Sequence, residues 1–149
     1  MFFYDEMKLC KKTLDNFGIN TMIPSDESKL SEDITVEEFE NFKKKVSLSY
    51  LKKIREAETL AILVFNEEKR GIPNYIGANT LAEIVMAFTW RRKVFLLNDI
   101  YEPLSDELKA WECTPIHKNY EIVNLYFREN CRKPYDGQPK QMSLFDFLD

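Results

Sequence analysis

Two short apolar runs constrain the fold of this chain more than any other feature of its sequence. They are Thr59–Asn66 and Val94–Asn98, and neither alternates between apolar and polar side chains. Such continuous runs are typical of strands that are covered on both faces, as in parallel sheets. Between them, Leu81–Trp90 has the apolar spacing of a helix. Strand, helix and strand in this order form a right-handed parallel βαβ unit. We therefore expect an α/β protein.

The loop that leaves the first of these strands is the predicted place for a functional site. It runs from Glu67 to Thr80 and contains two glycines and two asparagines. In parallel sheets, ligands bind in a crevice beyond the carboxyl ends of the strands. The loop begins at such an end, so its residues are expected to line the crevice.

Helix and strand patterns alternate along the rest of the chain. Apolar spacing, caps and stops predict helices at 2–17, 35–57, 81–90, 105–111 and 119–127, and strands at 19–23, 59–66, 94–98 and 114–116. The long second helix has a stripe that we expect to be buried: Phe39, Phe42, Val46, Ser49, Tyr50 and Ile54. The first element is a helix, whereas a doubly wound sheet normally starts with a strand.

Composition excludes several classes of function. The 149 residues carry a net charge of -4 and a pI near 5.2, which argues against direct nucleic-acid binding. No apolar run approaches the ~20 residues of a membrane span. No signal peptide is visible before Asp5, so we expect a cytoplasmic protein.

The cysteines and the single histidine suggest no metal site. Cys10, Cys113 and Cys131 are widely spaced and fit neither a metal-ligand pattern nor a disulfide framework, so reduced thiols are expected. His117 follows a predicted edge strand and is expected at the surface. We predict no cofactor.

The segments Ile62–Asn66, Gly71–Glu83 and Val94–Asn98 resemble small members of the nucleoside 2-deoxyribosyltransferase-like superfamily. The most specific part is the pattern Tyr-Ile-Gly-x-Asn-Thr-x-x-Glu at Tyr75–Glu83. The resemblance covers roughly residues 1–116. It implies a flavodoxin-like, three-layer parallel sheet, a nucleoside or nucleotide substrate, and a homo-oligomer, because family active sites often borrow a residue from a neighbour.

The superfamily uses a glutamate that attacks C1′ of a deoxyribose, and only Glu83 matches it. A carboxylate can trap the oxocarbenium-like state that forms when an N-glycosidic bond breaks. The amide end of a helix helps to keep such a carboxylate ionised. The resemblance further implies substrate contacts from Tyr4, Asn66, Gly77, Asn79, Thr80 and Asn98.

The sequence departs from the superfamily at three points. Gly77 replaces an aspartate of the characterised transferases, and Val85 replaces a glycine. The match begins at Phe3–Met7, just after the usual first strand and its Gly/Ser loop should have ended. We therefore expect a sheet that lacks the usual first strand. Either the true start lies upstream of Met1, or the chain is a degenerate member.

Each candidate residue also has a structural interpretation. Glu83 could cap the preceding loop, and Asn79 and Thr80 could cap the helix. Asn66 and Asn98 could close turns at the ends of their strands.

The last nine residues, Gln141–Asp149, resemble a peptide that binds a DNA sliding clamp. Gln141–Phe145 matches the bacterial pattern Gln-Leu-Ser-Leu-Phe except at Met142, while Gln141, Leu144 and Phe147, followed by Leu148, resemble the archaeal and eukaryotic pattern. Residues 130–140 contain two prolines and a glycine and are predicted to be a flexible tether after a domain at 1–129. The alternative is that the tail folds back onto its own domain.

Three functions are consistent with the sequence. The first is a nucleoside or nucleotide N-glycosidase or deoxyribosyltransferase with Glu83 as nucleophile. The second is a catalytically degenerate nucleotide-binding or adaptor domain that is tethered to a sliding clamp. A nucleotide sensor without turnover is a third.

Overall fold

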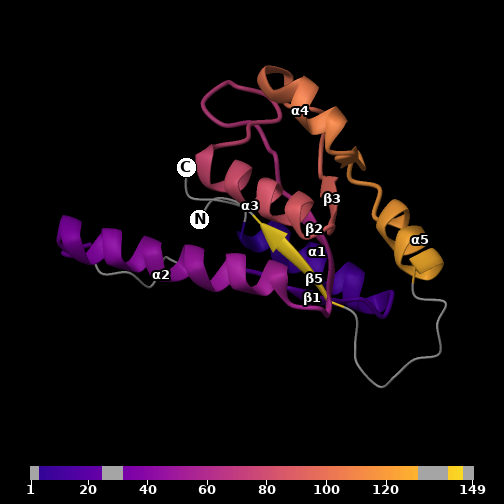
Figure 1. Ribbon diagram of the computed structural model, residues 1–149, viewed down its shortest axis with the longest axis horizontal. Coiled ribbons are helices and arrows are strands. Elements are labelled where there is room, and N and C mark those ends of the chain that lie inside the picture. Colours follow the sequence, from indigo (N-terminus) through magenta and orange to yellow (C-terminus); the bar gives the residue numbers. More distant parts are fainter. Residues whose placement is uncertain (1–3, 25–31, 131–140, 146–149) are drawn as a thin grey trace.

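The computed structural model describes residues 4–24 and 32–130, together with the backbone of 141–145. The helices are α1 (Tyr4–Asn16), α2 (Val36–Arg55), α3 (Ala78–Thr89), the 3-10 helix η2 (Glu102–Leu104), α4 (Ser105–Ala110) and α5 (Glu121–Asn130). The strands are β1 (Asn20–Met22), β2 (Thr59–Val64), β3 (Lys93–Leu96), β4 (Thr114–Pro115) and β5 (Gln141–Phe145). Helices and strands therefore alternate as expected (Figure 1).

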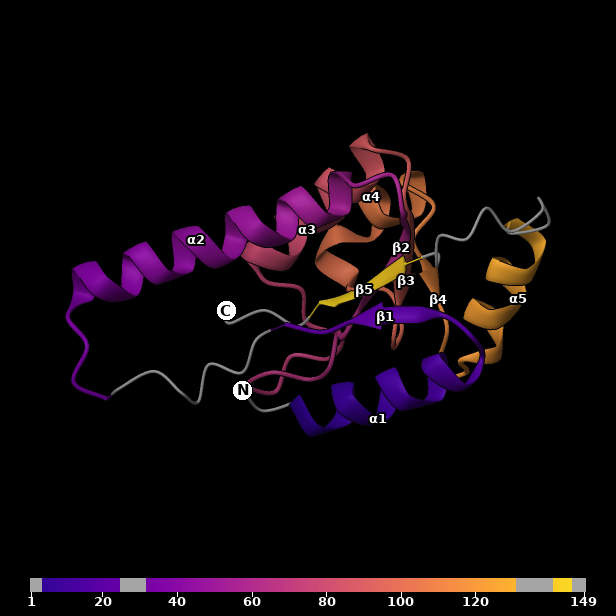
Figure 2. The same ribbon diagram turned by 90° about the horizontal axis from the view of Figure 1, so that it is seen from below.

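The strands form one sheet in the order β1-β5-β2-β3-β4, and every pairing is parallel. One apolar cluster joins α1 and α5 to Ala61, Leu63 and Phe65. A second cluster joins α2, α3 and α4 to Ile62 and Val64. Successive residues of β2 thus face opposite helical layers, which is why this strand is apolar without alternation. Figure 2 shows α1 on one side of the sheet and α2 and α3 on the other. The predicted three-layer α/β class is confirmed.

The segment that resembles a clamp peptide supplies the strand that the N-terminal part of the fold lacks. Within the described residues, α1 is the first element, and Gln141–Phe145 enters the sheet as β5 between β1 and β2. A flavodoxin-like sheet has the order 2-1-3-4-5, so its first strand occupies that position. In this chain the last strand occupies it instead. The predicted tether, apart from Asn130 at the end of α5, and Phe147 and Leu148 lie outside the described residues.

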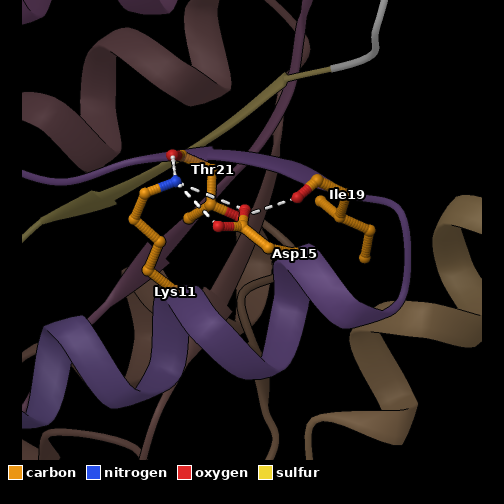
Figure 3. A network of polar contacts seen from close by, with 4 residues as sticks. All are labelled: Lys11, Asp15, Ile19 and Thr21. Atoms are coloured by element: carbon orange, nitrogen blue, oxygen red, sulfur yellow. Dashed lines mark hydrogen bonds and ion pairs between the residues drawn. The ribbon is translucent and has the colours of Figure 1, made fainter.

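Strand β1 is held at the edge of the sheet from two sides. Met142 of β5 pairs with Thr21 in the ladder. On α1, the Lys11 ammonium donates to the Thr21 carbonyl (2.7 Å) and to both Asp15 carboxylate oxygens (3.0 and 3.3 Å), and the Thr21 hydroxyl donates to the Ile19 carbonyl (3.2 Å; Figure 3). The lysine thus satisfies a carbonyl of an edge strand, which would otherwise be open to pairing with another chain.

Helix α2 begins where the sequence predicts, but fewer of its side chains are buried than expected. Thr35 and Glu38 form a capping box, with a Thr35 N–H to Glu38 Oε2 distance of 2.8 Å. Tyr50 and Ile54 are the buried side chains of this helix. The expectation of a fully buried stripe was wrong, because Phe39 and Ser49 are exposed and Phe42 and Val46 are half-buried. The amino-terminal part of the helix extends past the sheet (Figures 1 and 2).

None of the helices in the described part of the chain has the length and apolar character needed to cross a bilayer.

Candidate functional site

The candidate nucleophile lies on α3, the helix that joins β2 to β3. Gly77 is the N-cap of α3, with an extended backbone (φ -85°, ψ 179°), and its carbonyl accepts the Leu81 N–H at 2.9 Å. Glu83 follows in the second turn and is 2% exposed. Its neighbour Ile84 belongs to the apolar cluster between the sheet and α3. Burying a carboxylate among apolar side chains costs free energy. This cost makes Glu83 a candidate for a functional role, since packing alone would favour an apolar residue there.

The other residues of the Gly-Ala-Asn-Thr run lie in the first turn of α3. The helix starts at Ala78, earlier than the predicted start at Leu81. Asn79 and Thr80 therefore follow the N-cap position instead of occupying it, and Thr80 is 6% exposed. Their interpretation as N-caps was wrong. Substrate contact by Gly77, Asn79 and Thr80 stays a prediction.

Asn66 and Asn98 join the carboxyl ends of β2 and β3 to each other. The Asn66 amide donates to the Asp99 carbonyl (2.6 Å) and accepts the Asn98 N–H (2.9 Å). The Asn98 amide donates to the Asn66 carbonyl (3.1 Å). These bonds close the turns after both strands, as one of the two interpretations expected. Contact with a substrate stays a prediction for both residues.

Tyr4 lies at the same edge of the molecule. It is the first residue of α1, and its ring lies 4.4 Å from the Lys8 ammonium. Because α1 runs against the strands, its first residue lies toward their carboxyl ends (Figure 2). The fold therefore brings Tyr4 to the edge from which the loop before α3 also starts.

Three further pairs of side chains lie in the loops of this edge and were not singled out by the sequence analysis. Glu67 Oε1 forms an ion pair with the Lys118 ammonium at 3.1 Å. Tyr75 and Tyr101 make an edge-to-face contact with ring centroids 5.7 Å apart, and the Lys69 ammonium lies 5.6 Å from the Tyr75 ring. Glu67, Lys69 and Tyr75 belong to the predicted loop, but Lys118 comes from a distant turn that only the folded sheet brings close.

Two cysteine thiols have raised pKa values because they are buried. Burial raises the pKa of Cys10 to about 12, although a hydrogen bond with Tyr120 opposes the shift. Burial also raises the pKa of Cys113 to about 11. Both thiols are free and buried, and neither is suited to act as a nucleophile. His117 is exposed on a turn, as predicted.

Two hollows lie near the opposite edge of the sheet. One of about 570 Å³ lies between α2 and α3, and one of about 460 Å³ lies beside Phe88 and Trp111. The Arg92 guanidinium there donates to the carbonyls of Ile54, Arg55 and Glu56 at the end of α2 (3.0–3.1 Å). The Arg92 side chain thus provides hydrogen-bond donors for the last carbonyls of α2, and its positive charge is favourable at a helix C-terminus.

Among the described residues, no cluster of three or more His, Cys, Asp and Glu side chains could hold a metal ion. Comparisons with protein-family models, with curated proteins and with solved structures found no match to this chain.

Proposed function

We propose that the crevice at the carboxyl edge of the sheet binds a nucleoside or nucleotide and that Glu83 attacks its sugar. The observation that carries the proposal is a carboxylate, 2% exposed, in the second turn of the helix that leaves this crevice. The pattern at Tyr75–Glu83, which resembles a deoxyribosyltransferase motif, supports the same assignment.

The reaction would proceed by two displacements at C1′. A Glu83 carboxylate oxygen forms a bond to C1′ while the N-glycosidic bond breaks, and the leaving base takes up a proton. Water or a second base then attacks C1′, gives up a proton and frees Glu83. The aromatic pair Tyr75–Tyr101 offers a surface on which a base could stack.

The proposal includes a cytoplasmic location. The free thiols of Cys10 and Cys113 support it, because thiols stay reduced there.

The test is release of free base from deoxynucleosides and their monophosphates. We expect Glu83→Gln to reduce release by at least about a hundredfold, because it removes the nucleophile and nearly preserves the side-chain volume. Glu107→Gln is the matched control, since Glu107 is an exposed helical carboxylate. Thermal unfolding of both variants separates a loss of activity from a loss of fold. The proposal fails if the unaltered chain binds nucleotides without releasing base, as a sensor would, or if Glu83→Gln is as active as the control.

A second candidate function is attachment to a DNA sliding clamp through the tail. The supporting observation is the match of Gln141–Phe145 to a clamp-binding pattern. A synthetic peptide of residues 140–149 should bind the clamp of the same source with micromolar affinity. Gln141→Ala/Leu144→Ala should abolish this binding by removing the directed amide and the apolar anchor. Equal binding by the altered peptide, or no binding by either, would exclude the tail as a clamp ligand.

A further inference from the structure

Helix α2 is a long element that uses only its carboxyl-terminal part to pack against the described core. Its buried residues are Tyr50 and Ile54, and no side chain from Val36 to Ser49 is buried. The helix has 20 residues, and its first turns project beyond the sheet (Figures 1 and 2). An isolated helix of this kind is marginal in water unless an apolar face is covered.

The projecting part nevertheless has an apolar stripe. Val36 is 76% exposed and Phe39 is 40% exposed, and Phe42 and Val46 continue the stripe at helical spacing with part of their surface uncovered. These residues lie on the same face of α2 as Tyr50 and Ile54, in the part of the helix that extends beyond the sheet. Contiguous apolar surface of this kind, flanked by charges, marks an interaction surface.

The charges on the same part of the helix are separated by sign. Glu37, Glu38 and Glu40 precede the stripe's midpoint, and Lys43, Lys44 and Lys45 follow it. The Lys43 ammonium lies 5.9 Å from the Phe39 ring, so this cation borders the stripe. Helical spacing places Glu40 on the same flank of the stripe as Lys43, and Glu38 on the opposite flank with Lys45.

We propose that this part of α2 is the contact surface for a second copy of the chain, with the two helices antiparallel about a twofold axis near Asn41 and Phe42. In an isologous pair, each flank meets the same flank of the other copy. Glu40 then lies opposite Lys43 of the partner subunit, and Glu38 lies opposite Lys45 of the partner subunit. Both pairings are centred at the same point of the helix, between residues 41 and 42. One axis therefore satisfies the charges on both flanks while the apolar stripes meet.

This self-complementarity favours a second copy over an unrelated partner. A partner of one sign would leave either the glutamates or the lysines facing like charge. The overlap involves about three turns from each copy, so the contact lies at the small end of specific interfaces. We expect reversible dimerisation in the micromolar range, weakened by salt.

The test is exchange of charges between the two halves of the interface. In the proposed dimer, residue 40 of each copy faces residue 43 of the other, so each substitution acts at two places. Glu40→Lys puts two positive charges opposite each other at both places, and Lys43→Glu puts two negative charges there. Each variant alone should dimerise at least about tenfold more weakly, as followed by sedimentation equilibrium, because each ion pair becomes a repulsion. An equimolar mixture of the two should regain the original affinity as a heterodimer, since opposite charges face each other again.

Matched controls exclude general effects of charge. Glu129→Lys on α5 and Lys109→Glu on α4 reverse exposed charges elsewhere and should leave dimerisation unchanged. Phe39→Ser should weaken association with either partner. The inference fails if the chain stays monomeric at high micromolar concentration, in which case the stripe is covered within one chain or by another protein. It also fails if the mixture of Glu40→Lys and Lys43→Glu does not recover association.

Discussion

Cys10 and Tyr120 form a polar pair at the apolar interface between α1 and α5. Cys10 is 1% exposed, and burial raises its pKa to about 12. Burial, together with the neighbouring Cys10, also raises the pKa of Tyr120. Each group is therefore held in its neutral form by the fold, and each links folding to pH.

The thiol of Cys10 should make the protein less stable in base. In the unfolded chain it ionises near its ordinary pKa of 9.0, whereas in the folded chain it stays neutral to about pH 12. The unfolded state therefore loses protons first, and the free energy of unfolding falls as the pH rises above 9. Urea unfolding between pH 8 and pH 11 measures this fall. Cys10→Ala should start less stable, because a buried side chain is shortened, but should lose stability less steeply. Equal slopes for the two proteins would contradict the assignment.

At the residue scale, the sequence identifies candidate positions better than it identifies their contacts. Asn66 and Asn98 are conspicuous because each follows an apolar run, yet their mutual hydrogen bonds depend on β2 and β3 being neighbours. The Glu67–Lys118 ion pair has no signal in the sequence, since its two residues meet only after β4 has joined the sheet. Local chemistry is readable along the chain, while partners that are distant in sequence are not.

At the scale of elements, signals that act within a few residues are reliable. The Thr35–Glu38 capping box starts α2, and Gly18, at φ +80°, follows the end of α1 as expected of a helix stop. The stripe of α2 misleads because apolar periodicity shows which face is to be covered and not what covers it. The same signal is produced by Tyr50 and Ile54, which face the core, and by Phe39, which does not.

Strand β5 is the element that sequence patterns could not predict as a strand. It has five residues, and its pairing partners are Asn20–Met22 and Thr59–Val64, both remote in sequence. A short segment of mixed polarity at a central position gains its stability from two neighbouring strands rather than from its own residues.

At the scale of the whole molecule, the sheet depends on a strand that comes last in the chain. The described pairings of β1 are all with β5, so β1 joins the β2–β3–β4 half of the sheet through that strand. The carboxyl end of β5, at Phe145, is in register with Val64 at the end of β2. The same strand therefore completes the sheet and borders the proposed crevice.

This arrangement predicts that the full chain binds a sliding clamp more weakly than its own tail peptide does. Backbone groups of Gln141–Phe145 pair with β1 on one side and with β2 on the other, so binding a clamp pocket requires β5 to leave the sheet. Apparent affinity falls by the fraction of molecules in which the strand is released. We expect a dissociation constant at least about tenfold higher for the full chain than for the peptide of residues 140–149, with both measured by calorimetry.

A variant that loosens the strand should narrow this difference. Met22→Pro removes a backbone donor from β1, where Met22 is in register with Ser143 of β5 and the neighbouring Thr21 carbonyl faces Lys11 instead. It should bring the affinity of the full chain toward that of the peptide, while Gln141→Ala/Leu144→Ala should abolish binding in both. If the unaltered full chain and the peptide bind equally well, clamp binding does not require β5 to leave the sheet. If neither binds, the tail has no role as a clamp ligand, and its place in the sheet is its function.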